Sequence, residues 1–418
     1  MKRSLLFIGI AVLALSITSC KKYKNKEVYA NCPVYMDYEE FRHSFEVQSP
    51  TIIQNAGNIY VHNNYIFIND IDRGIQIYDN SDPYNCYPVG FLNIPGNTQM
   101  AVKENTLYAD SFMDLLTIDI SNIMNPQLKS RNMEVFSYSL PMINEGYPIA
   151  DIDKSKGVVI GWEVKKTKDV SGFMAKFNVK DCAECDAEEV ETKVAVSSNV
   201  NLAGSMSQFA VIDNYLYALD GMDIKSFDIT SASNTIPGAT RRTWAEPETF
   251  FPHGDLLMVG TTTGLMIYDA AADRDQPVHV STFEHVESCD PVVADGNYAY
   301  VTLRSGSDCG GDINELQVVD ISDPYWPTLA SDFEMYDPHG LAKDGNLLFI
   351  CDGDDGLKIF DATSPEGVGY LQMYQYENIQ TKDIIANNGI AIMIAENGVY
   401  LYDYTDPGNI FEINGIIF

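Results

Sequence analysis

The chain has 418 residues, of which 45% are hydrophobic, so it is long enough and apolar enough to bury a large core. Its 59 acidic and 27 basic residues leave a formal net charge of −32, which argues against a nucleic-acid ligand because phosphates require a basic surface. With 25 Tyr and 19 Phe, the composition favours a globular protein rich in β-strands.

The N-terminus predicts export and lipid attachment. Lys2 and Arg3 precede an apolar stretch over residues 5–15 that is too short to cross a bilayer, and small residues then lead to Cys20. This arrangement resembles the lipobox of bacterial lipoproteins, whose cysteine becomes the lipidated N-terminus. We therefore expect a signal peptide over residues 1–19, lipid on Cys20 and an anchored segment over residues 20–50. The expected location is the bacterial cell envelope at the outer membrane. The sequence does not decide between the periplasmic face and the cell-surface face of that membrane.

A repeated pattern fills residues 51–418: a turn, alternating apolar residues, and an Asp where the strand ends. Strong copies end at Asp79, Asp119, Asp228, Asp269, Asp320, Asp361 and Asp403, and a weaker copy ends at Asn178. Four of the seven intervals between these closing residues are 40–42 residues long. We expect each closing Asp to accept a hydrogen bond from the backbone N–H two residues on, which holds the next turn.

Each repeat is predicted to form four short strands. In the clearest one the strands cover residues 340–343, 346–351, 357–360 and 369–374, with Asp344-Gly345 as a hairpin turn. Four strands in every 40–50 residues are typical of a β-propeller. We predict an all-β fold, a single β-propeller with eight four-stranded blades, or seven if the copy ending at Asn178 is not a blade. Residues 42–47 and 410–417 are each candidates for an outer strand.

One repeat carries a family resemblance. The stretch Glu315–Pro324 reads Glu-Leu-Gln-Val-Val-Asp-Ile-Ser-Asp-Pro, and Asp295–Val301 precedes it with Asp-Gly-Asn-Tyr-Ala-Tyr-Val. Together they resemble the LVIVD repeat of bacterial extracytoplasmic proteins. The resemblance implies a propeller and export, and it brings no established reaction or catalytic motif.

Polar residues are expected around the central channel, because the first strand of each blade lines it. Alignment of the repeats places Thr98 and Ser207 in the first half of this ring and Glu248, Asp290, His339 and Asp383 in the second half. The last four are a candidate site at the channel mouth for a polyol, a cation or a basic group. The alternative interpretation is that they are polar because water fills the channel.

The loop with Asp352, Asp354 and Asp355 is a candidate calcium site, since Ca²⁺ prefers several carboxylate oxygens. The same residues are also good turn formers, and the spacing of an EF-hand is missing. No other cofactor is predicted.

The cysteines are candidates for disulfides in an oxidising compartment. The proposed pairs are Cys182–Cys185, Cys289–Cys309 and Cys32–Cys86. Cys351 lies in an apolar strand, where a buried free thiol is expected.

Motifs that would identify a reaction are missing from the sequence. It contains no Walker, dinucleotide, His-Glu-x-x-His or Gly-x-Ser-x-Gly pattern. We therefore expect a non-catalytic module that binds a protein or a glycan. The alternative is a hydrolase or lyase of envelope polysaccharide, whose channel-mouth carboxylates would need to lie roughly 5–10 Å apart. A third possibility is a structural envelope component, for which a plugged channel is the expected sign.

Overall fold

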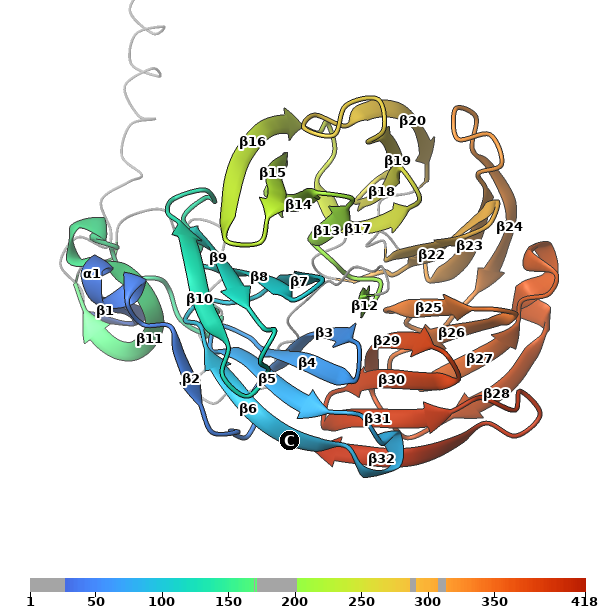
Figure 1. Cartoon of the computed structure of the whole chain (residues 1–418), viewed down its shortest axis with the longest axis horizontal. Helices are drawn as coiled ribbons and strands as arrows, with labels where there is room; N and C mark the ends of the chain where they lie inside the picture. Colours follow the sequence, from blue (N-terminus) through green and yellow to red (C-terminus); the bar gives the residue numbers. More distant parts are fainter. Residues whose placement is uncertain (1–26, 169, 171–200, 286–290, 307–312) are drawn as a thin grey trace, which may run out of the picture. The chain divides into compact units, whose positions relative to one another are not determined.

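The computed structural model describes residues 27–168, 170, 201–285, 291–306 and 313–418, which fall into two compact units (Figure 1). The smaller unit comprises residues 1–38 and 140–190, and the larger comprises residues 39–139 and 191–418. The predicted signal peptide and Cys20 lie outside the described residues. Within the described ranges, no helix is both long enough and apolar enough to cross a membrane.

The smaller unit is built around one antiparallel pair of strands. β1 (Val28–Met36) pairs with β11 (Val158–Thr167), and a short 3-10 helix, η2 (Lys154–Lys156), leads into β11. The buried side chain of Asn31 donates two hydrogen bonds of 2.8 Å to carbonyl groups of the loop before η2. These bonds satisfy a polar group that would otherwise be costly to bury.

In its described residues the larger unit contains seven sheets, called blades 1 to 7, and each has a core of four consecutive antiparallel strands. Blade 1 contains β3 (Ala56–His62), β4 (Tyr65–Asp70), β5 (Gly74–Asp79) and β6 (Tyr87–Asn93). Blade 2 contains β7 (Met100–Lys103), β8 (Thr106–Ser111), β9 (Asp114–Asp119) and β10 (Gln127–Asn132). Blade 3 contains β13 (Phe209–Ile212), β14 (Tyr215–Asp220), β15 (Asp223–Ser231) and β16 (Asn234–Arg242).

The remaining blades follow the same plan. Blade 4 contains β17 (Pro247–His253), β18 (Leu256–Thr261), β19 (Gly264–Asp269) and β20 (Val278–Glu284). Blade 5 contains β21 (Val292–Asp295), β22 (Tyr298–Leu303), β23 (Glu315–Asp320) and β24 (Thr328–Glu334). Blade 6 contains β25 (Leu341–Asp344), β26 (Leu347–Cys351), β27 (Leu357–Asp361) and β28 (Gln372–Tyr376). Blade 7 contains β29 (Thr381–Asn387), β30 (Ile390–Ala395), β31 (Gly398–Asp403) and β32 (Phe411–Ile417).

Five short elements complete the described chain. They are the helix α1 (Tyr38–Arg42), the strands β2 (Glu46–Gln48) and β12 (Asn201–Ala203), and the 3-10 helices η1 (Pro83–Asn85) and η3 (Pro365–Tyr370). β2 pairs with β6 at the outer edge of blade 1, while β12 pairs with β3 at its inner edge. β32 is the outer strand of blade 7 and matches the nominated segment 410–417, whereas only the last two residues of the nominated segment 42–47 lie in β2.

The predicted all-β propeller is confirmed, with seven blades rather than eight. The repeat ending at Asn178, which raised the count to eight, lies outside the described residues. It belongs to the long connection between blades 2 and 3, which also supplies β11 to the smaller unit and β12 to the inner edge of blade 1. Alternating apolar residues indicate a strand, but they do not specify which sheet the strand joins.

The second strands of the blades are the most completely buried, because neighbouring blades cover both of their faces. All six residues of β8 and all five of β26 are buried. Ile, Val, Phe and Tyr side chains from adjacent blades form shared clusters, as where Phe349 of blade 6 packs with Tyr402 of blade 7. Burial of this apolar surface between blades is the main force that holds the ring together.

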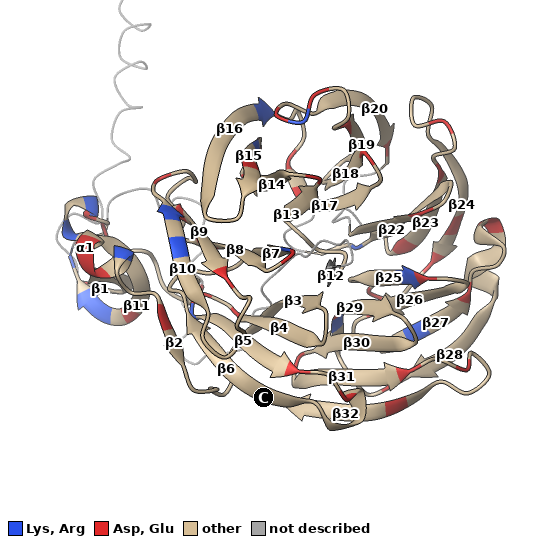
Figure 2. Ribbon diagram, in the orientation of Figure 1, with Lys and Arg blue, Asp and Glu red and all other residues tan. Residues whose placement is uncertain are grey.

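The closing Asp of every blade has the predicted role. Asp79, Asp119, Asp228, Asp269, Asp320, Asp361 and Asp403 each accept a hydrogen bond of 2.7–2.9 Å from the backbone N–H two residues on. Acidic residues accordingly recur at strand ends (Figure 2). Much of the negative charge of the chain thus supports its turns.

Blade 7 is joined to blade 1 by side-chain contacts at their outer edges. The Tyr84 hydroxyl of η1 donates a hydrogen bond of 2.6 Å to Asp403, and the Asn414 amide donates one of 3.4 Å to the carbonyl of Pro83. Asp403 therefore has two roles, since it holds its own turn and also binds across the seam between the first and last blades.

Asp403→Ala is expected to lower the free energy of unfolding more than Asp320→Ala does. Both variants lose the turn hydrogen bond, which is worth about 1 kcal/mol, but only the first also loses the bond to Tyr84. Urea unfolding followed by fluorescence measures the difference, and Tyr84→Phe serves as the control that removes the inter-blade bond alone. Equal losses in the two Ala variants would contradict the role assigned to the seam.

Candidate functional site

The centre of the propeller is partly filled by the chain itself. The innermost strands form a ring, because each contacts the innermost strand of the next blade and β29 contacts β3. β12 pairs with β3 inside this ring and also contacts β7 and β29 (Figure 1). Ser205 and Ser207, which follow β12, are completely buried. The segment 201–208 therefore occupies part of the channel that the sequence predicts.

Asp383 lies on β29 and is enclosed by this segment. Its carboxylate accepts hydrogen bonds of 3.3 Å from the backbone N–H and the hydroxyl of Ser205. Gly204 and Gly340 lie directly against the same carboxylate. A Cβ atom would lie 1.9 Å from a carboxylate oxygen if it were added to Gly204 and 2.0 Å from one if it were added to Gly340. The sequence predicts Asp383 at the channel mouth. In the structure its side chain is instead enclosed within the protein.

Burial also changes the ionisation of Asp383. Desolvation raises its pKa from 3.8 to about 7, against the lowering effect of the backbone of Ile384 and of Ser205. The Oδ2 atom is buried and has no hydrogen-bond partner among the described residues. A carboxyl group in this setting is protonated over much of the acidic range and cannot contact a substrate in this structure.

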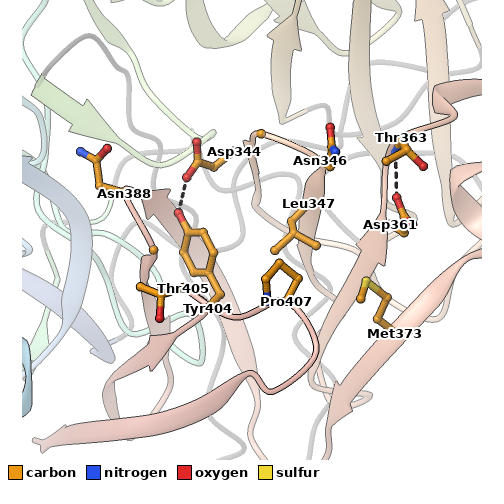
Figure 3. A pocket seen from close by; sticks show the side chains of 12 residues that line it. Asp344, Asn346, Leu347, Asp361, Thr363, Met373, Asn388, Tyr404, Thr405 and Pro407 are labelled. Atoms are coloured by element: carbon orange, nitrogen blue, oxygen red, sulfur yellow. Dashed lines mark hydrogen bonds between the residues drawn. The ribbon is translucent and has the colours of Figure 1, made fainter.

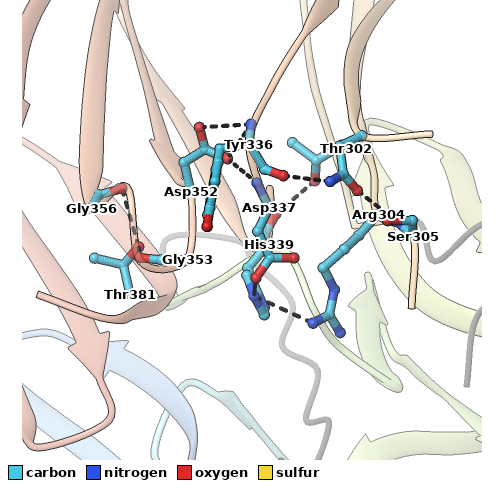
Figure 4. A network of polar contacts seen from close by, with 11 residues as sticks. Thr302, Arg304, Ser305, Tyr336, Asp337, His339, Asp352, Gly353, Gly356 and Thr381 are labelled. Atoms are coloured by element: carbon cyan, nitrogen blue, oxygen red, sulfur yellow. Dashed lines mark hydrogen bonds and ion pairs between the residues drawn. The ribbon is translucent and has the colours of Figure 1, made fainter. Parts of the chain in front are cut away.

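His339 lies in the polar network of Figure 4, between the strands of blades 5 and 6. Its Nε2 atom is 3.1 Å from Asp337 Oδ2 and 3.3 Å from Arg304 Nη1, and its carbonyl accepts a hydrogen bond of 2.7 Å from Thr302. The hydrogen bond with His339 and the positive charge of Arg304 lower the pKa of the Asp337 carboxyl. His339 is 7% exposed, and its bond with Thr302 links it to blade 5. Its role in this structure is therefore to join blades 5 and 6.

The three aspartates predicted to bind calcium do not form a cation site. Asp352 is completely buried and accepts hydrogen bonds of 3.2 and 2.8 Å from the backbone N–H groups of Tyr336 and Asp337. The ammonium group of Lys358 pairs with Asp352 and also with Asp355. A lysine therefore supplies the positive charge, and no group of three His, Cys, Asp or Glu in the described chain has the geometry to hold a metal.

The position of Asp352 recurs in other blades, a feature that the sequence analysis missed. Asp70 ends β4 and accepts hydrogen bonds from the backbone of Gln54 and Asn55, and Asp110 near the end of β8 accepts them from Thr98 and Gln99. In blades 1, 2 and 6 this buried carboxylate fastens the chain that enters the first strand to the end of the second. The signal was available, because an Asp follows the second apolar run in these repeats.

The other candidate residues are placed as follows. Glu248 lies on β17 of blade 4, at a register shift between Pro247 and Thr249. Asp290 lies outside the described residues, as do Cys182, Cys185, Cys289 and Cys309. The structure therefore places His339 and Asp383 in blades 6 and 7 and Glu248 in blade 4, and the predicted site at the channel mouth stays a prediction because Asp290 lies outside the described residues.

The predicted Cys32–Cys86 disulfide is not formed in this structure, where Cys32, Cys86 and Cys351 are free thiols. Cys32 lies on β1, where its Sγ atom is 3.9 Å from the carbonyl of Lys165. Cys86 packs instead against an apolar cluster, and burial raises its pKa to about 12.

An open pocket of about 560 Å³ lies between blades 6 and 7, away from the buried carboxylates (Figure 3). Its polar lining includes Asp344, Asn346, Asp361, Thr363 and Asn388, and its apolar lining includes Leu347, Met373 and Pro407. Tyr404 donates a hydrogen bond to Asp344, and the backbone N–H of Thr363 donates one to Asp361. This mixture of apolar wall and acceptor groups is typical of a ligand pocket.

Comparison with known proteins agrees with the architecture. The LVIVD repeat model matches residues 54–88, 95–134 and 288–334. These stretches fall in blades 1, 2 and 5, and the third includes the stretch in which the resemblance was noted. No curated protein matches the chain in sequence.

Several solved structures share the fold at low sequence identity. A putative 6-phosphogluconolactonase from Bacteroides uniformis has a TM-score of 0.55 at 11% identity, covering 87% of this chain and 97% of its own. A protein from Lactobacillus plantarum also has a TM-score of 0.55 at 11% identity, covering 87% and 96%. The periplasmic gluconolactonase of Pseudomonas aeruginosa has a TM-score of 0.53 at 9% identity, covering 89% and 96%. In its described residues the larger unit is a seven-bladed β-propeller, and three stretches of the chain match the LVIVD repeat.

Proposed function

We propose that the protein is a non-catalytic binding module of the bacterial cell envelope, attached to a membrane through lipid on Cys20. Its propeller is a rigid support, and the surface between blades 6 and 7 contacts the ligand. One observation carries the proposal: Asp383, a carboxylate that a channel-mouth enzyme would use, is enclosed, while the pocket between blades 6 and 7 is open.

The enclosed groups weigh against the polysaccharide-processing enzyme. A glycosidase needs two carboxyl groups that both reach the bond to be cleaved. Asp383 is covered by Gly204 and Gly340, and Asp352 is engaged by Lys358 and two backbone N–H groups. The gluconolactonases named above share the fold alone, so their activity provides no support for a lactonase here.

Replacing Cys20 by Ser is expected to move the protein from the membrane fraction to the soluble fraction of the envelope. The thiol is the atom that would carry the lipid, and two acyl chains give stable anchoring that a hydroxyl side chain cannot. Labelled palmitate incorporation and membrane fractionation measure the change, with Cys86→Ser as the control cysteine. An unlabelled wild-type protein would contradict the proposed anchor.

Binding and catalysis are separated by one set of variants. In crosslinked envelopes, we expect a partner to be recovered with the wild-type protein and with Asp320→Asn. A folded Asp383→Asn variant should also recover the partner, because Asp383 is enclosed and does not contact the ligand. Purified full-length protein is expected to release no reducing ends from isolated envelope polysaccharide. Release that is abolished by Asp383→Asn in a folded variant would overturn the binding-module proposal in favour of an enzyme.

A further inference from the structure

The pocket between blades 6 and 7 is strongly acidic. It contains the carboxylates of Asp344 and Asp361, and its described lining includes no Lys, Arg or His. Tyr404 is 6% exposed, and burial together with its bond to Asp344 raises its pKa far above the usual range, so it keeps donating to that carboxylate. The hydrogen bonds from Tyr404 and Thr363 fix both acids in place.

An exposed apolar surface adjoins the pocket. Tyr370, Leu371 and Met373 are 83%, 40% and 40% exposed, and Met373 also lines the pocket. Leu371 is joined to the pocket because its carbonyl accepts a hydrogen bond of 2.9 Å from the N–H of Asp361. The ring of Tyr370 packs edge-on against Phe333 of blade 5 at a centroid distance of 5.1 Å, which orders this exposed ring.

We propose that this pocket receives a positively charged side chain of a partner protein, arginine in particular, while apolar residues beside that arginine pack on Tyr370, Leu371 and Met373. The proposal rests on the proposed function, for which it names the kind of partner. Arg and Lys combine an apolar stem with a cationic head, which matches a pocket that has Leu347, Met373 and Pro407 beside two carboxylates.

Charge favours this ligand over a neutral glycan. A neutral sugar would cover Asp344 and Asp361 without supplying a positive charge, and that would partly desolvate two carboxylates for which the described lining holds no cation. A guanidinium can instead donate to both acids at once. The net charge of −32 also attracts basic segments toward the surface. Tyr, Met and Arg are enriched at protein interfaces, which fits the apolar flank.

A short peptide tests the proposal with the full-length protein. The probe is a fluorescent peptide with one arginine between leucine and tyrosine residues, and its control carries citrulline, which has the same shape without the charge. We expect the arginine peptide to bind at least about tenfold more tightly, and rising salt to weaken it. Asp344→Asn combined with Asp361→Asn removes both charges, keeps the hydrogen-bond acceptors, and should abolish this preference.

Two further variants make the test specific. Asp320→Asn changes the equivalent turn acid of blade 5, outside the pocket, and should leave both peptides unaffected. Tyr370→Ala should weaken the arginine and citrulline peptides by the same factor, because it touches only the apolar flank. Circular dichroism and urea unfolding establish that each variant is folded.

Four outcomes would overturn the inference. The first is equal binding of the arginine and citrulline peptides, and the second is an arginine preference that survives the double Asp variant. The third is binding of an envelope oligosaccharide, but of neither peptide, that the double variant abolishes, because the pocket would then be a glycan site. A partner still recovered from envelopes with the double variant would remove this inference and leave the proposed function standing.

Discussion

Replacing Asp383 by Asn is expected to stabilise the protein at pH 8 and to flatten the dependence of its stability on pH. Burial raises the pKa of Asp383 from 3.8 to about 7, so the folded state binds a proton more tightly than the unfolded chain does. Stability from this group is complete below pH 4 and is lost as the pH rises to 7. At about 1.4 kcal/mol for each pH unit, the loss approaches roughly 4 kcal/mol, and an Asn side chain avoids it because it is neutral.

Asp110 provides the matched control with the opposite expected result. Burial also raises its pKa, to about 6, but its carboxylate accepts hydrogen bonds from Asn97, from the backbone and hydroxyl of Thr98, and from Gln99. Asp110→Asn should lower the free energy of unfolding, because the Asn NH2 group would replace an acceptor oxygen and would face the hydrogen-bond donors that now bind it. Thermal melts of both variants from pH 4 to pH 8 measure the contrast. A melting temperature of Asp383→Asn below that of the wild type at pH 8 would contradict the view that Asp383 is a buried carboxyl group whose charge is costly in the folded state.

Replacing Lys358 by Met is expected to lower the free energy of unfolding by about 3 kcal/mol. The ammonium is the charge partner of Asp352, whose side chain is completely buried, and its own side chain is 11% exposed. Without it, Asp352 would remain as a buried carboxylate supported only by backbone N–H groups. Urea unfolding of Lys358→Met measures the loss, and Asp355→Ala should cost much less because Asp355 is 40% exposed.

A double-mutant cycle tests whether the pair acts as a unit. If Lys358 matters mainly by compensating Asp352, the combination of Lys358→Met with Asp352→Asn should be more stable than Lys358→Met alone. Strictly additive losses would show that Lys358 stabilises blade 6 by its packing and not by its charge. Added calcium should rescue neither single variant, because the loop uses a lysine where a metal was predicted.

Local patterns were enough to predict the fold. Each blade is a contiguous four-stranded meander. A sheet made of consecutive strands can be predicted from local signals, which here are alternating apolar residues, glycine turns and a closing Asp. The bond from Asp361 to the N–H of Thr363 is one instance of a prediction that depends only on adjacent positions. The blade number was left open between eight and seven, because membership of a sheet depends on strand pairing, which a local pattern does not encode, and the described residues contain seven blades.

The site was harder to predict because its geometry depends on residues far apart in the chain. Asp383 was correctly placed on the first strand of its blade, but its enclosure comes from Ser205, 178 positions away. Lys358 follows Asp352 by six positions on the next strand, and only the register of that hairpin brings the ammonium to the carboxylate. The pocket was not predicted at all, since its walls combine turns of two blades.

The seam between blades 1 and 7 has a consequence for the order in which the chain folds. Blades are local and can form as soon as their own strands are available, whereas the bond between Tyr84 and Asp403 joins residues 319 positions apart. Closing so long a loop is entropically expensive and is favoured only after the intervening blades are compact. During synthesis blade 1 is the first blade to emerge, and its flank stays uncovered until β32 is made. Ring closure is therefore the last step of folding, and the open arc that precedes it is the species most exposed to aggregation and proteolysis.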